Sequence, residues 1–535
     1  MRVFRKIFFY TVLFACFTAC NGEYGKPSWD MNVAAPLVKT SLNINNLMSD
    51  TLLKSSPTDS SLTLVYNNNL YTFQVDSLLN IPDTTLAYSY HLPSGSYTFS
   101  PGQLIVDQTK TTMYSLRGAQ LTNATIQSGD VKFDIKSYVP ALTDYTYSIP
   151  SATLNGIPFS ITVQVPAATN SAPGVYNGTY SLAGYKIDLK GPSENTFNTL
   201  TTNLQASVDN SVVGGVTVYP ADSLIIDNTF EQMIPSYARG YFGQQIFNVG
   251  PATTAVNIFN HISNGNIQLQ NASMIITINN GFGIDATAVI NTLSSENTHS
   301  GSTVLLTNSV IGSPININRA TETGNPYNPV NTSVYTVSMD NTNSNITSLI
   351  GNLPNQFGYG IKITTNPLGN VSGGNDFMYA GHTISANLDI QVPLALVANN
   401  LTLEDTVTTN FAPASGNSHL NNGTFILWAN NGFPFSAQVQ LYLLNQNNQI
   451  TDSLCANNFI NPAPVNALYK VIAPLITQAS IPLTSAKLTE LQNTKKIFIK
   501  SVFNTSNKPT YIKLYSNYSL DLKLTGNFNY TISLH

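Results

Sequence analysis

Short runs in which apolar and polar residues alternate are the feature that most limits how this chain can fold. Such runs, each ended by Gly, Pro or Asn, recur along most of the sequence, as in "GVTVYP", "MIITINNG", "VQLYLLN", "KIFIKSVF" and "YIKLYSNYSLDLKLTG". An apolar residue at every second position gives a strand one apolar face. Many short strands separated by turn residues predict an all-β chain, built from several β-sandwich-like modules in tandem.

Helical periodicity is scarce, so we expect few short helices. The best candidate is "LTSAKLTELQNTKK", in which Thr484 or Ser485 could cap a helix before Leu488 and Leu491. Near the start of the chain, "SLTLVYNNNLYTFQVDSLL" (61–79) reads as a hairpin whose two strands are joined by an Asn-rich turn.

The sequence also contains an internal echo. "MIITINNGFGIDATAVI" (274–290) and "FILWANNGFPFSAQVQL" (425–441) align at Asn-Asn-Gly-Phe, and "VKFDIKSYVPALTDYTYSI" (131–149) is a looser third copy without the glycine. We expect Gly281 and Gly432 to supply positive φ at a turn between two strands. Either the copies mark three related modules, or Asn-rich strands resemble one another by chance.

The length of 535 residues exceeds the roughly 250–300 residues at which single cores stop growing, so several domains are expected. We expect Trp29 to pack the N-terminal linker onto the first module. The predicted segments are a signal peptide (1–19), an anchor linker (20–55), an N-terminal β region (56–115) and three β-modules (116–245, 246–412 and 413–535).

The N-terminus has the features of a secretory signal. Arg2, Arg5 and Lys6 precede an uncharged apolar run over residues 7–17, which is too short to span a bilayer as a helix. The run leads into "FTAC" (17–20), which ends at Cys20. One interpretation is an ordinary secretory signal peptide in which this cysteine occurs by chance.

"FTAC" resembles the lipobox of bacterial lipoproteins. Thr18 and Ala19 are the small residues that this family has before its cysteine, and Phe17 stands where the family usually has Leu or Val. The resemblance implies that Cys20 carries the lipid and that the chain is anchored in an outer membrane, on the periplasmic or the cell-surface side. Two or more acyl chains hold a protein firmly to a bilayer.

The composition argues against nucleic acid as a partner. Only 9% of residues are charged and the formal net charge is −4, so no basic face for nucleic acid is expected. A weakly charged surface tends to associate. Sugars or protein partners could cover it, although AT-rich coding could also explain the many Asn residues.

No catalytic chemistry can be read from the chain. The six histidines show no HExxH spacing, and neither a G-x-S-x-G elbow nor a phosphate-binding loop occurs. We therefore predict no catalytic residues, no metal site and no cofactor.

A recurrent tripeptide, Asp followed by Ser or Thr and then an apolar residue or Thr, resembles the O-glycosylation sequon of one group of Gram-negative bacteria. Composition alone would give roughly two copies. The alternative is Asx or ST turns, in which Asp accepts from the backbone two residues on. The six candidate hydroxyls are Thr51, Ser77, Thr84, Ser223, Thr406 and Ser453.

The sequence thus predicts a non-catalytic envelope lipoprotein that acts as a binding or structural subunit of an outer-membrane assembly, with other envelope proteins as partners. One alternative is a surface glycan-binding or fimbrial-type adhesin lipoprotein, which would share the anchor and the β-modules. Another is an envelope enzyme whose site is assembled from loops.

Overall fold

The structure, a computed structural model, describes residues 28–44, 52–74, 81–91, 94–259, 262–409, 418–505 and 510–533. These residues form antiparallel β-strands and two short helices, α3 (Ile346–Gly351) and α4 (Ser485–Asn493). The predicted all-β class with few short helices is confirmed. The predicted cap is also present, because Thr484 Oγ1 accepts a hydrogen bond from Lys487 N at 3.4 Å.

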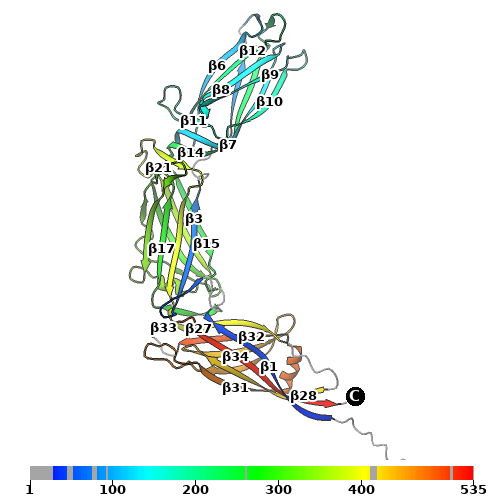
Figure 1. Ribbon diagram of the computed structural model, residues 1–535, viewed down its shortest axis with the longest axis vertical. Coiled ribbons are helices and arrows are strands. Elements are labelled where there is room, and N and C mark those ends of the chain that lie inside the picture. Colours follow the sequence, from blue (N-terminus) through cyan, green and yellow to red (C-terminus); the bar gives the residue numbers. More distant parts are fainter. Residues whose placement is uncertain are drawn as a thin grey trace, which may run out of the picture.

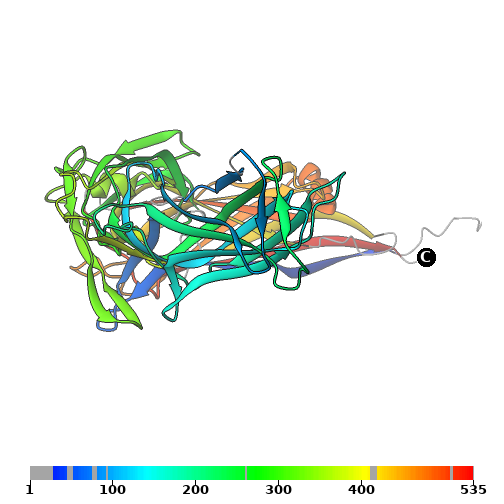
Figure 2. The same cartoon turned by 90° about the horizontal axis from the view of Figure 1, so that it is seen from above.

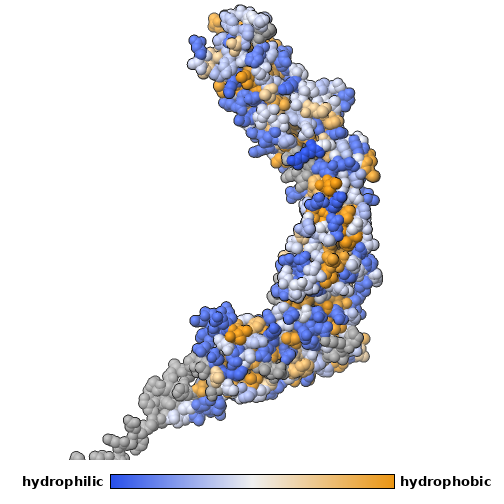
Figure 3. Space-filling model, turned by 180° about the vertical axis from the view of Figure 1, so that it is seen from behind, coloured by the Kyte–Doolittle hydropathy of each residue, from blue (hydrophilic) through white to orange (hydrophobic). Residues whose placement is uncertain are grey.

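Three β-sandwich modules lie end to end in a curved rod (Figures 1 and 3). We call them the proximal module (28–44 and 395–533), the middle module (52–74 and 246–393) and the distal module (81–241). The described chain starts at Ser28 in the proximal module, passes through the middle module to the distal one, and then returns by the same route.

The proximal module contains both ends of the described chain. Its first sheet has the order β1 (Ser28–Asn43), β34 (Ser519–Ser533), β28 (Ser418–Asn431) and β31 (Leu475–Leu483). Its second sheet has the order β27 (Ala395–Thr408), β32 (Lys496–Thr505), β29 (Phe435–Leu444) and β30 (Ile450–Ile460). Two further strands pair with β27, namely β33 (Ile512–Lys513) and β16 (Ile262–Leu269), and β16 is contributed by the chain segment of the middle module.

The middle module repeats this arrangement. One sheet has the order β2 (Leu53–Ser55), β3 (Leu62–Phe73), β26 (Ile384–Pro393), β17 (Ser273–Asn280) and β23 (Ser333–Asp340). The other has β15 (Ile246–Ala255), β24 (Gln356–Thr365) and β18 (Ala286–Asn297), and β18 also pairs with β19 (Ser302–Leu305) and β20 (Pro314–Ile317). A separate ribbon is formed by β21 (Thr321–Asn325) and β22 (Asn328–Asn331).

The distal module has the same two layers. One contains β4 (Thr84–Tyr90), β14 (Leu224–Tyr241), β7 (Gln120–Ser137) and β10 (Gly174–Ser181), and the other contains β6 (Leu104–Met113), β12 (Thr199–Val208), β8 (Thr143–Leu154) and β9 (Ile157–Val165). Strand β11 (Lys186–Asp188) pairs with both β7 and β8, and so joins the layers. Strand β5 (Tyr97–Phe99) pairs with β13 (Val216–Val218), and β25 (Asp376–Tyr379) pairs with β14.

The eight main strands of every module follow one order. Numbered along the chain, they pair 1-8-3-6 in one sheet and 2-7-4-5 in the other, which is the jelly-roll order. The middle module is inserted between the first and second strands of the proximal module, β1 and β27. The distal module is inserted at the same point of the middle module, between β3 and β15. The protein is therefore three nested copies of one fold.

This nesting corrects most of the predicted boundaries. The boundary at residue 246 coincides with the start of β15, but 116 lies inside the distal module and 413 inside the proximal one. The predicted linker 20–55 contains β1, which pairs with β34 along its whole length. Trp29 does not pack a linker, because its side chain is 49% exposed in β1. Pairing between the two ends of a chain leaves no local sequence signal.

Two turn predictions are also corrected. Residues 62–73 form one continuous strand, and the three Asn residues expected in a hairpin turn lie inside it, paired with β26. The echo at 274–290 and 425–441 is the third and fourth strands of the middle and proximal modules, and 131–149 is their distal equivalent. However, neither Gly281 nor Gly432 has positive φ. Glycine is favoured there by close packing, since a Cβ would lie 3.0 Å from Thr383 O at position 281 and 2.9 Å from Ser519 O at position 432.

Buried hydrophobic side chains connect the modules. One continuous cluster of buried side chains runs through the proximal and middle modules and into the distal module, whereas the rest of the distal core forms a separate cluster. The distal residues in the continuous cluster are Leu116, Ala119, Leu121 and Ala238. A third, small cluster of Ala320, Val330 and Phe377 lies at the distal–middle junction, against Tyr237 and Tyr379. Buried apolar contacts therefore join the distal module to the middle one, and Tyr237 and Tyr379 beside the small cluster also line the groove described next.

Candidate binding groove at the distal–middle junction

The predicted modification sites are scattered over the molecule. Cys20, Thr51 and Ser77 lie outside the described residues. Thr84 begins β4 and is half-buried, Thr406 is exposed within β27, and Ser453 is half-buried in β30. Ser223 precedes β14 and is only 8% exposed, so its hydroxyl is covered in the folded chain.

The alternative interpretation of these tripeptides, a turn in which Asp accepts from the backbone two residues on, does not describe the four Asp residues that the structure covers. The Asp222 carboxylate accepts from Tyr219 N, and the Asp83 carboxylate accepts from Gln232 N, far along the chain. Asp405 and Asp452 each accept from the next residue, Thr406 or Ser453.

The junction between the distal and middle modules is built around β25. This short strand lies between β24 and β26 of the middle module, and it pairs with β14 of the distal module, with Tyr379 opposite Tyr237. Asp376, at its start, is completely buried. The Asp376 carboxylate accepts from Asn366 Nδ2 at 2.7 Å and from Phe242 N at 3.1 Å.

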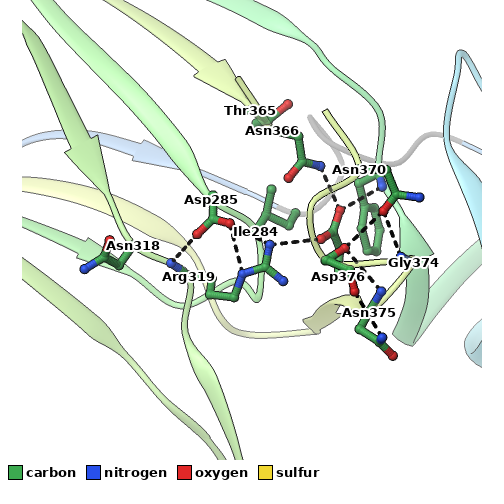
Figure 4. Close-up of polar contacts among 12 residues, drawn as sticks. Ile284, Asp285, Asn318, Arg319, Thr365, Asn366, Asn370, Gly374, Asn375 and Asp376 are labelled. Atoms are coloured by element: carbon green, nitrogen blue, oxygen red, sulfur yellow. Dashed lines mark hydrogen bonds and ion pairs between the residues drawn. The ribbon is translucent and has the colours of Figure 1, made fainter. Parts of the chain in front are cut away.

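A cation compensates the buried charge of Asp376. Arg319 Nη2 lies 3.4 Å from Asp376 Oδ1 and 2.7 Å from Asp285 Oδ2, so one guanidinium bridges two carboxylates (Figure 4). Asp285 also accepts from Arg319 Nε at 3.1 Å and from Arg319 N at 3.2 Å. A buried carboxylate requires such partners, and these contacts fix where β25 begins.

A second set of polar contacts joins the two modules directly. Arg239 of β14 forms an ion pair with Glu322 of the β21–β22 ribbon, and its Nε donates to Tyr237 Oη at 2.7 Å. Tyr379 Oη donates to Glu322 Oε1 at 3.0 Å. Burial raises the pKa of Tyr237, and burial together with the bond to Glu322 raises the pKa of Tyr379 to about 12. Both phenols are therefore neutral donors near neutral pH.

These contacts place the two tyrosines at one end of a groove of about 730 Å³. Its floor is a row of directly opposed residues across five strands, namely Tyr379, Tyr237, Thr125, Lys186 and Thr153. The two tyrosine rings lie 4.7 Å apart between centroids, tilted by 49°. The volume lies within the range of small-molecule sites.

The floor and walls of the groove carry polar groups that are free to bind a ligand. In the part of the chain that the structure describes, the side chains of Asn123, Thr125, Thr153 and Lys186 make no hydrogen bond, and the buried Ser151 Oγ has no partner. Aromatic rings beside hydroxyl, amide and amine groups suit a hydroxyl-rich ligand, because a sugar has both an apolar ring face and hydrogen-bonding edges.

The sequence did not indicate this groove. Its residues come from five strands, several of them distant in sequence, and no local pattern marks them as neighbours. Among the described residues, no group of three or more His, Cys, Asp or Glu side chains is placed to hold a metal ion. No helix within the described ranges has both the length and the apolar composition needed to cross a membrane.

Comparisons with known proteins add little. No protein-family model and no curated protein matches the chain. Among solved structures, the chain is similar to a protein of Parabacteroides distasonis provisionally described as secreted, with 8% identity and a TM-score of 0.29 over 94% of this chain and 100% of that one. It is also similar to the VP2 subviral particle of infectious bursal disease virus, with 10% identity and a TM-score of 0.12 over 91% and 85% of the two chains.

Proposed function

We propose that this chain is a non-catalytic lipoprotein of the bacterial outer membrane, which acts as a binding subunit of an envelope assembly. The signal-like N-terminus and the lipobox-like "FTAC" support lipidation at Cys20. A lipid at this position would hold one end of the rod at the bilayer and leave the rest of the molecule to meet partners.

The observation that carries the proposal is the pairing of β1 with β34 in the proximal module. Cys20 lies eight residues before Ser28, the first residue of β1, and eight extended residues span at most about 26–29 Å. An anchored Cys20 therefore keeps the proximal module near the membrane. The distal module lies at the other end of the rod (Figure 1), and the groove lies at its junction with the middle module.

The test is gentle detergent extraction of outer membranes, followed by purification of the native protein and identification of what remains bound. We expect acyl chains on Cys20 and a partner in stoichiometric amount. The variant Cys20→Ser should accumulate as an unlipidated precursor. Metabolic labelling that still shows acyl chains on this variant would overturn the anchor, and a protein that is purified alone would overturn the subunit role.

The junction groove favours a second function, binding of glycans. The row of Tyr379, Tyr237, Thr125, Lys186 and Thr153 offers ring faces and free polar groups on one surface. A sugar ring could stack on the tyrosines while its hydroxyls bond to the polar side chains.

A glycan array tests this second function. Tyr379→Ala and Lys186→Gln should each weaken binding at least tenfold, whereas Tyr219→Ala, which removes an exposed tyrosine elsewhere in the distal module, should not. Circular dichroism of each variant controls for folding. Equal binding by all three variants would remove the groove as the site.

A further inference from the structure

The ends of β1 and β34 project past the body of the proximal module, in the direction away from the middle module (Figures 1 and 2). In this ribbon Ser28 is opposite Ser533, Met31 is opposite Tyr530 and Val33 is opposite Phe528. The first residues of β28 pair with the other edge of β34. The ribbon is the part of the described structure that directly follows the N-terminal segment containing Cys20.

One face of the ribbon is apolar and uncovered. Trp29, Met31 and Val33 alternate along β1 and therefore point to the same side, which is the side of the buried Phe528. This face continues the core face of the sheet beyond the sandwich. Trp29 is 49% exposed and Met31 is 43% exposed, while Tyr530 packs against the core.

The opposite face of the ribbon is polar, and its groups are paired with one another. Thr531 Oγ1 donates to Asp30 Oδ1 at 2.6 Å, and Asn529 Nδ2 donates to Asn32 Oδ1 at 2.8 Å. Asn421 Nδ2 donates to both Asn529 and Thr531. The ribbon is therefore amphipathic, with a row of hydrogen-bonded polar side chains on one side and a tryptophan and a methionine on the other.

We propose that the apolar face of this ribbon contacts the lipid bilayer, with Trp29 and Met31 in the headgroup region. This inference rests on the proposed lipidation, which would hold Cys20 at the membrane and the start of β1 within about 29 Å of it. Tryptophan favours the membrane–water interface because its ring is apolar and its N–H is polar. The proximal module would then meet the membrane in a defined orientation instead of hanging from a loose tether.

The chain contains only two tryptophans, Trp29 and Trp428, so fluorescence can report on each alone. Trp428 is a matched control. It is 40% exposed, lies in β28 of the same sheet and is opposite Lys523, on the polar outer side. Trp428→Phe leaves Trp29 as the reporter, and Trp29→Phe leaves Trp428.

The experiment places each lipidated variant in vesicles of phosphatidylethanolamine and phosphatidylglycerol, with or without brominated acyl chains. We expect Trp29 emission to shift to shorter wavelength and to lose at least half its intensity to the bromines, while Trp428 changes little. Unquenched, water-like emission from Trp29 would overturn the proposal. A blue shift without vesicles that grows with protein concentration would also overturn it, because a second copy would then cover the face.

The mass of the purified protein separates this proposal from the proposed function. A protein without acyl chains would overturn the lipoprotein assignment. The contact between the ribbon and the bilayer would then be tested on the unacylated protein at high vesicle concentration. Quenching of Trp29 there would support the contact, and unquenched emission would overturn it.

Discussion

Asn280 and Asn431 make the same three hydrogen bonds in two different modules. Each side chain is completely buried at the end of the third strand of its jelly roll. Each Oδ1 accepts from the backbone N–H two residues on, at 2.9 Å. Each Nδ2 donates to two backbone carbonyls, those of Ile284 and Asn318 in the middle module, and those of Phe435 and Asn461 in the proximal module.

The distal module has a reduced version of this arrangement. Ser137 occupies the equivalent position, and its Oγ accepts from Val139 N at 3.3 Å. A backbone hydrogen bond next to this position is present in all three modules. The donors are the N–H groups of Ala168, Ala320 and Ala463, and the acceptors are the carbonyls of Val139, Phe282 and Phe433, respectively. The three modules therefore share these hydrogen bonds of the turn, although the residue that makes the side-chain bond differs in the distal module.

Asn431→Ala should destabilise the protein by about 2–4 kcal/mol, because it removes the hydrogen bonds of a buried carbonyl, a part-buried carbonyl and a buried N–H. Urea unfolding measures the change. Asn430→Ala is the control, since that half-buried side chain makes only a 3.4 Å bond to Asp521, and it should cost less than about 0.5 kcal/mol. Equal effects of the two substitutions would contradict the role given to Asn431.

Replacing Asn228 in the distal core by an apolar residue should stabilise the protein. Its side chain is completely buried and neither amide atom has a hydrogen-bond partner. An unsatisfied buried polar group costs about 1–3 kcal/mol, and an apolar group of similar size removes that cost. Asn228→Leu should therefore raise the thermal midpoint, whereas Asn280→Leu should lower it. A fall in both midpoints would contradict this prediction and would indicate that the Asn228 amide is hydrogen-bonded in solution.

Arg319→Leu should loosen the junction, because it leaves the carboxylates of Asp285 and Asp376 without their shared cation. Removing one partner of a buried ion pair costs about 3–5 kcal/mol. Hydrogen exchange should accelerate in β25 and in the facing end of β14. Lys362→Leu, which replaces an exposed cation of the same module, is the control and should leave exchange unchanged. Unaltered protection of β25 in Arg319→Leu would refute the assignment.

Tyr379 should titrate at about 12, because burial and the neighbouring Glu322 carboxylate disfavour the phenolate. A folded-state pKa above the usual 10 means that this contribution to stability is complete below pH 10 and is lost as the pH rises through about 12. NMR of labelled tyrosine measures the titration. Glu322→Gln should lower the pKa towards 10, and a pKa that does not move would exclude Glu322 as a cause.

Glycosylation, if present, should follow exposure of the sequon hydroxyls in the folded chain. Thr406 is exposed and should carry sugar, whereas Ser223, at 8% exposure, should not. Bulky sugars would also limit association of a weakly charged β-surface. The measurement is intact mass of the native protein with site mapping by mass spectrometry. A mass equal to polypeptide plus lipid would exclude glycosylation altogether.

Several features could be predicted from the sequence because they depend on neighbouring residues. Alternating apolar residues define strands, Thr484 is placed to cap a helix, and the echo at 274–290 and 425–441 marks equivalent strands of two modules. Each of these signals lies within one or two elements. The all-β class follows from such signals alone, whereas the sequence left the repeat open until the strand order showed that the copies are equivalent.

The nesting and the groove were decided only by the tertiary structure, because they depend on pairing between distant segments. Asn32 bonds to Asn529 across 497 positions, and Tyr237 meets Tyr379 only when β25 crosses to another module. Local rules also misled where packing overrides them. Asn67 to Asn69 stay in a strand because β26 pairs beside them, and at Gly281 a side chain is disfavoured by the nearby Thr383 carbonyl instead of by the glycine's φ. Strand periodicity fixes which face a residue takes, but it does not specify which strand will lie beside it.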